Sequence, residues 1–174
     1  MTEIKRKGSR STKDITVDIS EKLNKAEIET ANLVEWLAID QKLLLKNVLQ
    51  QTNRSKYFEP IITNIEALKK QTVNSINESI GTSLFRLAKM ENDNELFSIL
   101  STHKSDLVRC WATYIIGKNE ELSITEVLNQ IQPFSADKHF GVREICWLAV
   151  RTSIAKNLTE SLVILSHWTK HSDE

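Results

Sequence analysis

Apolar side chains recur at three- and four-residue intervals along most of this chain, a spacing typical of amphipathic helices. The clearest run passes through Val73, Ile76, Ile80, Leu84 and Leu87, and it predicts a helix over 73–88. Weaker runs of the same kind predict helices over 19–30, 32–51, 55–68 and 96–100. Asp18 or Ser20 is expected to cap the first of these helices, and Asp40 is expected to restart the second.

The C-terminal part of the sequence contains an internal repeat. When 108–134 is moved forward by 34 residues it falls on 142–168, so that Val-Arg meets Val-Arg and Thr-Glu meets Thr-Glu. Each copy predicts two helices, and the second begins after a capping residue, Ser123 or Asn157, with a glutamate three positions on. The alternative is that two unrelated amphipathic helix pairs align by chance. A period near 34 with two helices per unit favours an α-hairpin solenoid.

We therefore expect an all-α fold, a right-handed α-solenoid of stacked helical hairpins (an α-α superhelix). The domain prediction is a basic flexible tail over 1–17 and a single helical-repeat domain over 18–174. A third unit would begin near position 176, and the sequence ends at Glu174. The last helix pair is thus expected to expose one face, which could be covered by homo-association through the C-terminal helix.

Composition sets limits on the class of protein. The net charge is zero, but residues 1–13 carry five basic side chains and one acidic one, a balance of +4 that leaves −4 for the rest. With 40% hydrophobic and 26% charged residues, and no apolar run of membrane-spanning length, we expect a soluble protein without a membrane partner. No signal peptide is recognisable, and Cys110 and Cys146 sit in apolar segments, as buried reduced thiols do, so the expected location is cytoplasmic.

The motifs of several enzyme classes are missing. The sequence contains no phosphate-binding glycine loop, no GxSxG, no HExxH and no CxxC. The only closely spaced histidines are His167 and His171, near a helix end, where a surface pair is expected. We predict no metal and no cofactor.

One segment combines residues suited to nucleic acid. On a helix starting near Phe140, Arg143, Trp147 and Arg151 share one face because they are spaced by four. Two arginines could bind phosphates while the indole meets a sugar or base. The alternative is that Trp147 belongs to the core and that the arginines serve repeat stacking, as the repeated Val-Arg pair suggests.

The segment His139-Phe-Gly-Val-Arg-Glu144, followed by Trp147-Leu-Ala149, resembles the signature of the HEAT-like DNA alkylation repair proteins of the AlkC/AlkD superfamily, and of its AlkC-like members in particular. The stretches 23–30 and 33–41 resemble the N-terminal region of that family. The sequence departs from the family at Ile145, where relatives often carry an aromatic residue, and it lacks the further Arg-rich repeat and C-terminal helical unit with which the family usually continues.

The resemblance implies a HEAT-like fold and excision of a cationic alkylated base, such as 3-methyladenine, from double-stranded DNA by hydrolysis of the N-glycosidic bond. Glu144 is then the candidate catalytic carboxylate and Trp147 the candidate indole. Arg109, His139, Arg143 and Arg151 are the candidate DNA-binding residues. Because part of the family's length is missing, it stays open whether the chain is an enzyme. The alternative is a non-catalytic helical-repeat scaffold that binds protein or DNA.

Overall fold

The computed structural model describes residues 6–169, and within this range every regular element is helical. The ten α-helices of this range are α1 (Val17–Asn24), α2 (Leu33–Ala38), α3 (Gln41–Gln51), α4 (Phe58–Glu66), α5 (Val73–Glu91), α6 (Leu96–Ser101), α7 (Asp106–Lys118), α8 (Ile124–Ser135), α9 (Phe140–Lys156) and α10 (Leu158–Trp168). Two short 3-10 helices, Thr12–Asp14 and Ser55–Tyr57, precede α1 and α4. The all-α prediction is confirmed.

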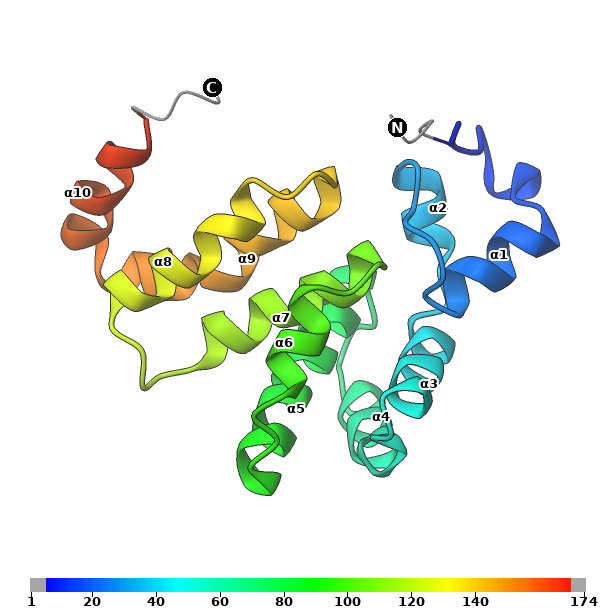
Figure 1. Ribbon diagram of the computed structural model, residues 1–174, viewed down its shortest axis with the longest axis horizontal. Helices are drawn as coiled ribbons and strands as arrows, with labels where there is room; N and C mark the ends of the chain where they lie inside the picture. The colour runs from blue at the N-terminus through cyan, green and yellow to red at the C-terminus, as the bar shows by residue number, and fades with distance from the viewer. Residues whose placement is uncertain (1–5, 170–174) are drawn as a thin grey trace.

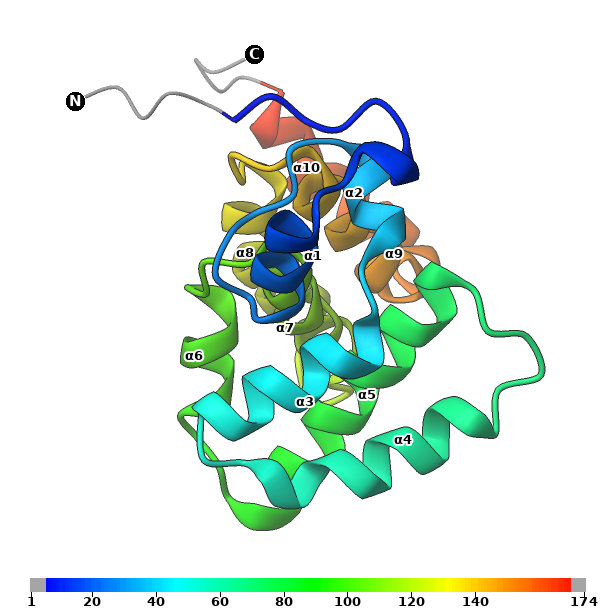
Figure 2. The same cartoon turned by 90° about the vertical axis from the view of Figure 1, so that its right-hand side faces the viewer.

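Helix α7 lies at the centre of the packing, with α5 on one side and α9 on the other (Figure 1). Helices α1 and α2 stand at one end of the long axis and α10 at the other. Figure 2 shows α3 and α4 below α1 and α2, in front of α5. None of the helices described is long and apolar enough to span a membrane.

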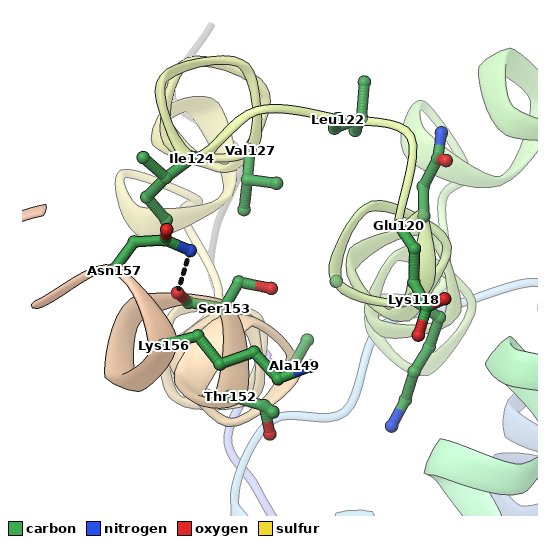
Figure 3. Close-up of a pocket in the computed structure, with 12 residues that line it drawn as sticks. Lys118, Glu120, Leu122, Ile124, Val127, Ala149, Thr152, Ser153, Lys156 and Asn157 are labelled. Atoms are coloured by element: carbon green, nitrogen blue, oxygen red, sulfur yellow. Dashed lines mark hydrogen bonds between the residues drawn. The ribbon is translucent and has the colours of Figure 1, made fainter. Parts of the chain in front are cut away.

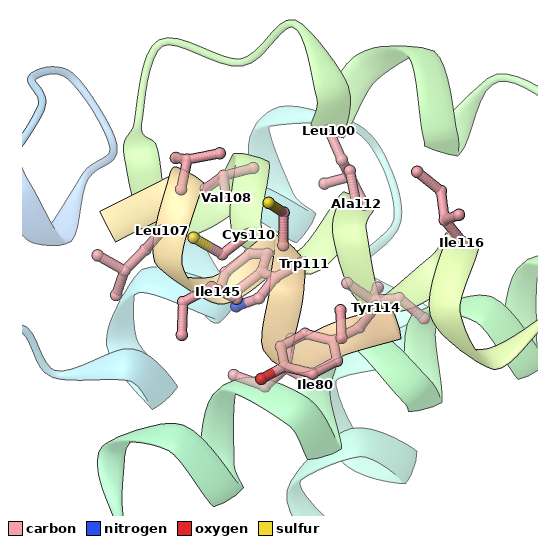
Figure 4. Packing of buried hydrophobic residues seen from close by; sticks show 14 of the residues in the cluster. Ile80, Leu100, Leu107, Val108, Cys110, Trp111, Ala112, Tyr114, Ile116 and Ile145 are labelled. Atoms are coloured by element: carbon pink, nitrogen blue, oxygen red, sulfur yellow. The ribbon is translucent and has the colours of Figure 1, made fainter. Parts of the chain in front are cut away.

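Part of the core lies where α5, α7 and α9 meet (Figure 4), and the same buried cluster continues into α3, α4, α6 and α8. Trp111 of α7 is its largest fully buried side chain, with Ile80 of α5 and Ile145 of α9 nearby. Glycine permits the close approach of two of these helices, because a Cβ at Gly117 of α7 would overlap the backbone carbonyl of Ala149 in α9. The central helices are therefore in contact over backbone as well as side chains.

The helix starts follow the predicted repeat. Helices α7 and α8 begin at Asp106 and Ile124, and α9 and α10 begin 34 residues later, at Phe140 and Leu158. The capping box of α8 is confirmed: the backbone N–H of Ser123 donates to Glu126 over 2.8 Å, and Ser123 Oγ accepts from the Glu126 N–H. The corresponding cap of α10 does not form, since the Asn157 amide donates instead to the Ser153 carbonyl.

The N-terminal helices differ most from the sequence predictions. The helix expected over 19–30 ends at Asn24, because Ala26 adopts a left-handed backbone conformation with φ 58°. Its cap is Thr16, whose Oγ1 accepts from the Ile19 N–H, rather than Asp18 or Ser20. Asp40 does restart the second helix, accepting from the backbone N–H groups of α3's first turn.

Residues 6–9 of the predicted flexible tail have a fixed place against α2. The two terminal guanidinium nitrogens of Arg6 donate to the Glu35 carboxylate, over 2.7 and 2.6 Å. Ser9 donates its backbone N–H to the same group, and the Asn32 amide donates to the Ser9 carbonyl. The flexible tail therefore does not extend through residue 17 as predicted; residues 1–5 lie outside the described residues.

Candidate functional site

Helix α9 presents the candidate residues as one exposed stripe. Arg143, Glu144, Trp147 and Arg151 are all exposed, and the first, third and last follow one another at four-residue spacing. The opposite side of α9 is buried against α7 and α8. We call these four residues the α9 stripe.

Trp147 lies at the middle of the α9 stripe, and its side chain reaches toward α10. Its ring centroid is 5.9 Å from that of Trp168, with the two rings tilted by 50°. Trp147 nevertheless keeps 37% of its surface exposed, so it is a surface residue that packs on one side against Trp168 and is not part of the core. A ring held in this way on one side can offer its free face to a ligand.

Arg109 was a predicted DNA contact, but the structure places it in a buried ion-pair network, with 6% of its surface exposed. All five of its N–H groups are used. Two donate to Asp137 (2.8 and 2.9 Å), one to Glu29 (2.6 Å), and two to the carbonyls of His103 and Lys104. No donor remains for a phosphate. The DNA-binding prediction for Arg109 is therefore corrected: its side chain joins three loops of the protein.

The charges within this network hold one another in the ionised form. Burial alone would lower the pKa of Arg109, but the hydrogen bonds to Asp137 and Glu29 raise it above its ordinary value. Burial alone would raise the pKa of Asp137, but hydrogen bonds from Arg109 and from the His139 N–H hold it below the ordinary range. Lys138 adds a second cation to Glu29 at 3.1 Å.

His139 was also predicted to contact DNA, and it too is buried, with 6% of its surface exposed. As the N-cap of α9 it accepts from the Gly141 N–H at Nδ1, so Nε2 carries the proton and donates to the Thr30 carbonyl over 2.9 Å. Its ring stacks on Trp36 at 5.9 Å. Asp106, which is completely buried, lies 3.4 Å from Nδ1 and accepts from Thr30 N–H and Oγ1–H. This environment does not fit a DNA contact at His139.

Asp106 and Glu35 are buried carboxylates that the sequence interpretation missed, and their environments differ. Burial raises the pKa of Asp106, and the hydrogen bonds from Thr30 only partly oppose it. Burial acts in the same direction on Glu35, but Arg6 and two backbone N–H groups outweigh it and lower the pKa of Glu35 to about 2. Both carboxylates anchor the N-terminal segment and neither faces the α9 stripe.

The repeat allows α9 to be compared with α7 position by position. The NH1 group of Arg109 donates to the carbonyl of His103, and that of Arg143 donates to the carbonyl of Asp137, exactly one period later. The rest of the α9 stripe then corresponds to α7 residues that face α9. These are Cys110, whose thiol lies 3.9 Å from the Gly141 carbonyl, together with Thr113 and Gly117.

The α9 stripe differs from its α7 counterpart in size and charge. Where α7 has Cys110, Thr113 and Gly117, α9 has glutamate, tryptophan and arginine. Small residues allow two helices to approach closely, whereas long charged ones hold a neighbour away. The same face of the repeat unit is therefore a packing surface on α7 and an open polar-aromatic surface on α9.

Two cavities of the described region have no lining residue from the α9 stripe. The larger, about 450 Å³, lies between the α7–α8 loop and the C-terminal half of α9, where Lys118, Leu122 and Lys156 line it (Figure 3). A second, of about 340 Å³, lies between α4 and α5. Neither is lined by Glu144 or Trp147. Residues 6–169 also hold no group of three or more His, Cys, Asp or Glu side chains arranged for a metal ion.

Compared with protein-family models, curated proteins and solved structures, the chain matches none. Its likeness to alkylation repair proteins thus rests on the motif residues, of which Arg143, Glu144 and Trp147 are exposed and His139 is buried.

Proposed function

We propose that this chain is a HEAT-like right-handed α-solenoid of the DNA alkylation repair class, and that it binds duplex DNA through the α9 stripe. One observation carries the proposal: Arg143, Trp147 and Arg151 stand exposed together, and the last two occupy positions where the preceding repeat unit has the small packing residues Thr113 and Gly117. The motif around them supports the assignment to the repair class. A cytoplasmic location belongs to the same proposal, supported by the two buried free thiols.

The exposed groups suit the chemistry of base excision. Arg143 and Arg151 bind phosphates of the strand, and the indole of Trp147 attracts a cationic alkylated base or the cationic sugar by its π face. The bond from sugar C1′ to the base nitrogen breaks, and its electron pair leaves with the base, which becomes neutral. Glu144 stabilises the positive sugar and accepts a proton from the water that adds at C1′. This route uses no metal or cofactor.

Duplex binding tests the DNA part of the proposal. Affinity is expected to fall steeply with added salt, and the double variant R143A/R151A is expected to reduce the slope of log K against log salt by about 2, one phosphate contact for each arginine. Arg86→Ala, an exposed arginine on α5, is the matched control and should leave the slope unchanged. Binding that is absent, or indifferent to salt and to both arginines, contradicts the proposal.

Base release tests the enzymatic part separately. Purified protein incubated with alkylated duplex is expected to release 3-methyladenine, and Glu144→Gln is expected to abolish the release while leaving duplex affinity within about twofold. No release from a preparation that binds the duplex would leave a DNA-binding protein without glycosylase activity.

A non-catalytic scaffold is the second candidate, and one observation favours it specifically. Leu158 and Leu162 of α10 expose 55% and 58% of their surfaces, on the helix whose Trp168 lies beside Trp147, an apolar arrangement that suits contact with protein. A scaffold that binds protein alone would show neither duplex binding nor base release, and one that binds DNA would show duplex binding without base release.

A further inference from the structure

The loops that lead into α7 and α9 carry a lysine at the same repeat position. Lys104 and Lys138 are 34 residues apart, one period of the repeat, and both are exposed. Each stands two residues before the first residue of its helix. Arg109 joins the two loops, because its guanidinium donates both to the Lys104 carbonyl and to the Asp137 carboxylate. The two lysines therefore lie on one edge of the molecule, at neighbouring helix starts.

The N-terminal segment brings a third cation to this edge. Arg6 donates to the Glu29 carbonyl over 3.2 Å, and the Glu29 carboxylate pairs with Lys138 over 3.1 Å. Lys7, the next residue along the chain from Arg6, is exposed. It therefore stands on the same edge as the loop before α9. We call Lys7, Lys104 and Lys138 the edge lysines.

The carboxylates that contact this edge are much less exposed than the lysines. The exposed fractions of their side chains are 0% for Glu35 and Asp106, 12% for Asp137 and 25% for Glu29. Arg6 pairs with Glu35, and Arg109 pairs with both Glu29 and Asp137. The Lys138 side chain, by contrast, is 69% exposed. These carboxylates are thus largely neutralised within the protein, and the lysines carry charge that faces solvent.

The contacts of Lys104 and Lys138 leave both available to an external anion. Lys138 pairs with Glu29 on the surface, and an ion pair that involves an exposed lysine adds little to stability. Glu29 keeps Arg109 as a partner if Lys138 moves away. Among residues 6–169, Lys104 has no ion-pair partner. An anion that binds these two side chains therefore displaces no contact on which the fold depends.

We propose that the edge lysines bind phosphates of duplex DNA and so continue the DNA surface of the α9 stripe. This inference rests on the proposed function and extends it to a second set of contacts with the same duplex. Arg143 connects the two parts, because it belongs to the α9 stripe and donates to the Asp137 carbonyl, next to Lys138.

The spacing of the repeat suits a DNA strand. Packed helices lie about 8–10 Å apart, and one strand carries a phosphate for about every 3.4 Å of the duplex axis. Lysines at the starts of neighbouring helices can therefore bind phosphates about three nucleotides apart on one strand. Contacts of this kind position the duplex and carry no information about its bases. The edge lysines should thus contribute equally to the binding of alkylated and unmodified DNA.

Salt titration of duplex binding tests the inference. The double variant K104A/K138A is expected to lower the slope of log K against log salt by about 2, and adding Lys7→Ala should lower it by about 1 more. The change should be the same for alkylated and unmodified duplex. K104R/K138R retains both charges and should restore the slope. Urea unfolding should find K104A/K138A nearly as stable as the unsubstituted protein, because both lysines are exposed.

The matched control is K69A/K70A. Lys69 and Lys70 are also exposed loop lysines, but they lie in the loop between α4 and α5, on the opposite side of the molecule from α6 and the loop that follows it (Figure 2). Their replacement removes the same amount of charge and should leave the slope unchanged. A slope lowered equally by both double variants would reflect net charge alone and would overturn the inference.

The outcomes separate this inference from the proposed function. A slope that responds to R143A/R151A but not to K104A/K138A overturns the inference and leaves binding through the α9 stripe intact. A slope that responds to K104A/K138A but not to R143A/R151A supports the edge lysines and contradicts binding through the α9 stripe. The absence of duplex binding overturns both.

Discussion

Replacement of Arg109 by methionine should destabilise this protein more than any exposed substitution on the same helices. Methionine keeps much of the length and packing of the side chain but removes all five donors. Asp137, whose side chain is 12% exposed, loses its cationic partner, and two backbone carbonyls before α7 lose their donors. The perturbation is therefore an uncompensated buried charge in an otherwise filled site.

The magnitude follows from which groups are left without a partner. Removing one member of a buried ion pair costs about 3–5 kcal/mol. Glu29 adds little to the loss of stability, because its side chain is 25% exposed and it keeps Lys138 as a partner. We therefore expect about 3 kcal/mol, the lower end of that range. For a chain of this size this corresponds to a fall in Tm of about 6–12 °C.

The assay is urea or thermal unfolding at several pH values. The lowered pKa of Asp137 means that its contribution to stability is present above the ordinary aspartate pKa, about 4, and is lost as pH falls through the folded value. Without Arg109, burial raises the pKa of Asp137, and protonation of Asp137 then removes the unpaired buried charge. The difference in unfolding free energy between the unsubstituted protein and the Arg109→Met variant should therefore become smaller as pH falls from about 6 to about 3.

Arg143→Met provides the control, since Arg143 makes the same backbone contact one period later but is exposed. It should change stability by no more than about 0.5 kcal/mol. Adding Asp137→Asn to the Arg109 variant should recover part of the loss, because the unpaired charge is gone. Equal losses of stability in Arg109→Met and Arg143→Met would refute the reasoning. So would a stability difference between the unsubstituted protein and the Arg109 variant that does not change with pH.

Three further predictions concern packing, capping and charge. Gly117→Ala should cost about 1–3 kcal/mol in urea unfolding, because its Cβ would overlap the Ala149 carbonyl; a neutral effect would mean that α7 and α9 can separate freely. Ser123→Ala should cost about 1 kcal/mol through loss of the α8 cap, whereas Asn157→Ala, whose side chain does not cap α10 and makes only an exposed bond to the Ser153 carbonyl, should cost less in the same assay. Glu35→Gln should destabilise the protein at neutral pH. The stability difference from the unsubstituted protein should become smaller below the ordinary glutamate pKa, as pH falls toward the folded pKa of Glu35 of about 2. Acid titration followed by circular dichroism measures it, and a difference that stays constant would mean that the ion pair is unimportant.

The sequence predicts the local features of this fold well, because they depend on neighbouring residues. Helix starts near 140 and 158, the capping box at Ser123 and the restart at Asp40 all follow from spacing and capping chemistry within a few residues. The end of α1 was mispredicted because Ala26 takes a left-handed backbone conformation, and an alanine side chain does not favour that conformation.

The buried network is not predictable from local pattern, because its members come from distant loops. Arg109 and Arg143 occupy the same repeat position. Arg109 is part of the buried network only because it pairs with Glu29, 80 residues away in the sequence, and with Asp137, 28 residues away. His139 is equally ambiguous until Thr30 is placed beside it. One signal was available: an aspartate or histidine stands three residues before each first helix of the repeat, at Asp137 and His103.

The contact between Thr30 and His139 has a consequence for synthesis on the ribosome. The two residues are 109 positions apart, so the N-terminal segment cannot adopt its final contacts when it emerges. At ordinary elongation rates its partner follows after roughly 5 to 20 seconds. During that interval Thr30 lacks the His139 ring, whereas the contacts of Arg6 and Ser9 with Glu35 need only 26 to 29 further residues. The N-terminal segment can therefore be joined to α2 well before it is joined to the start of α9.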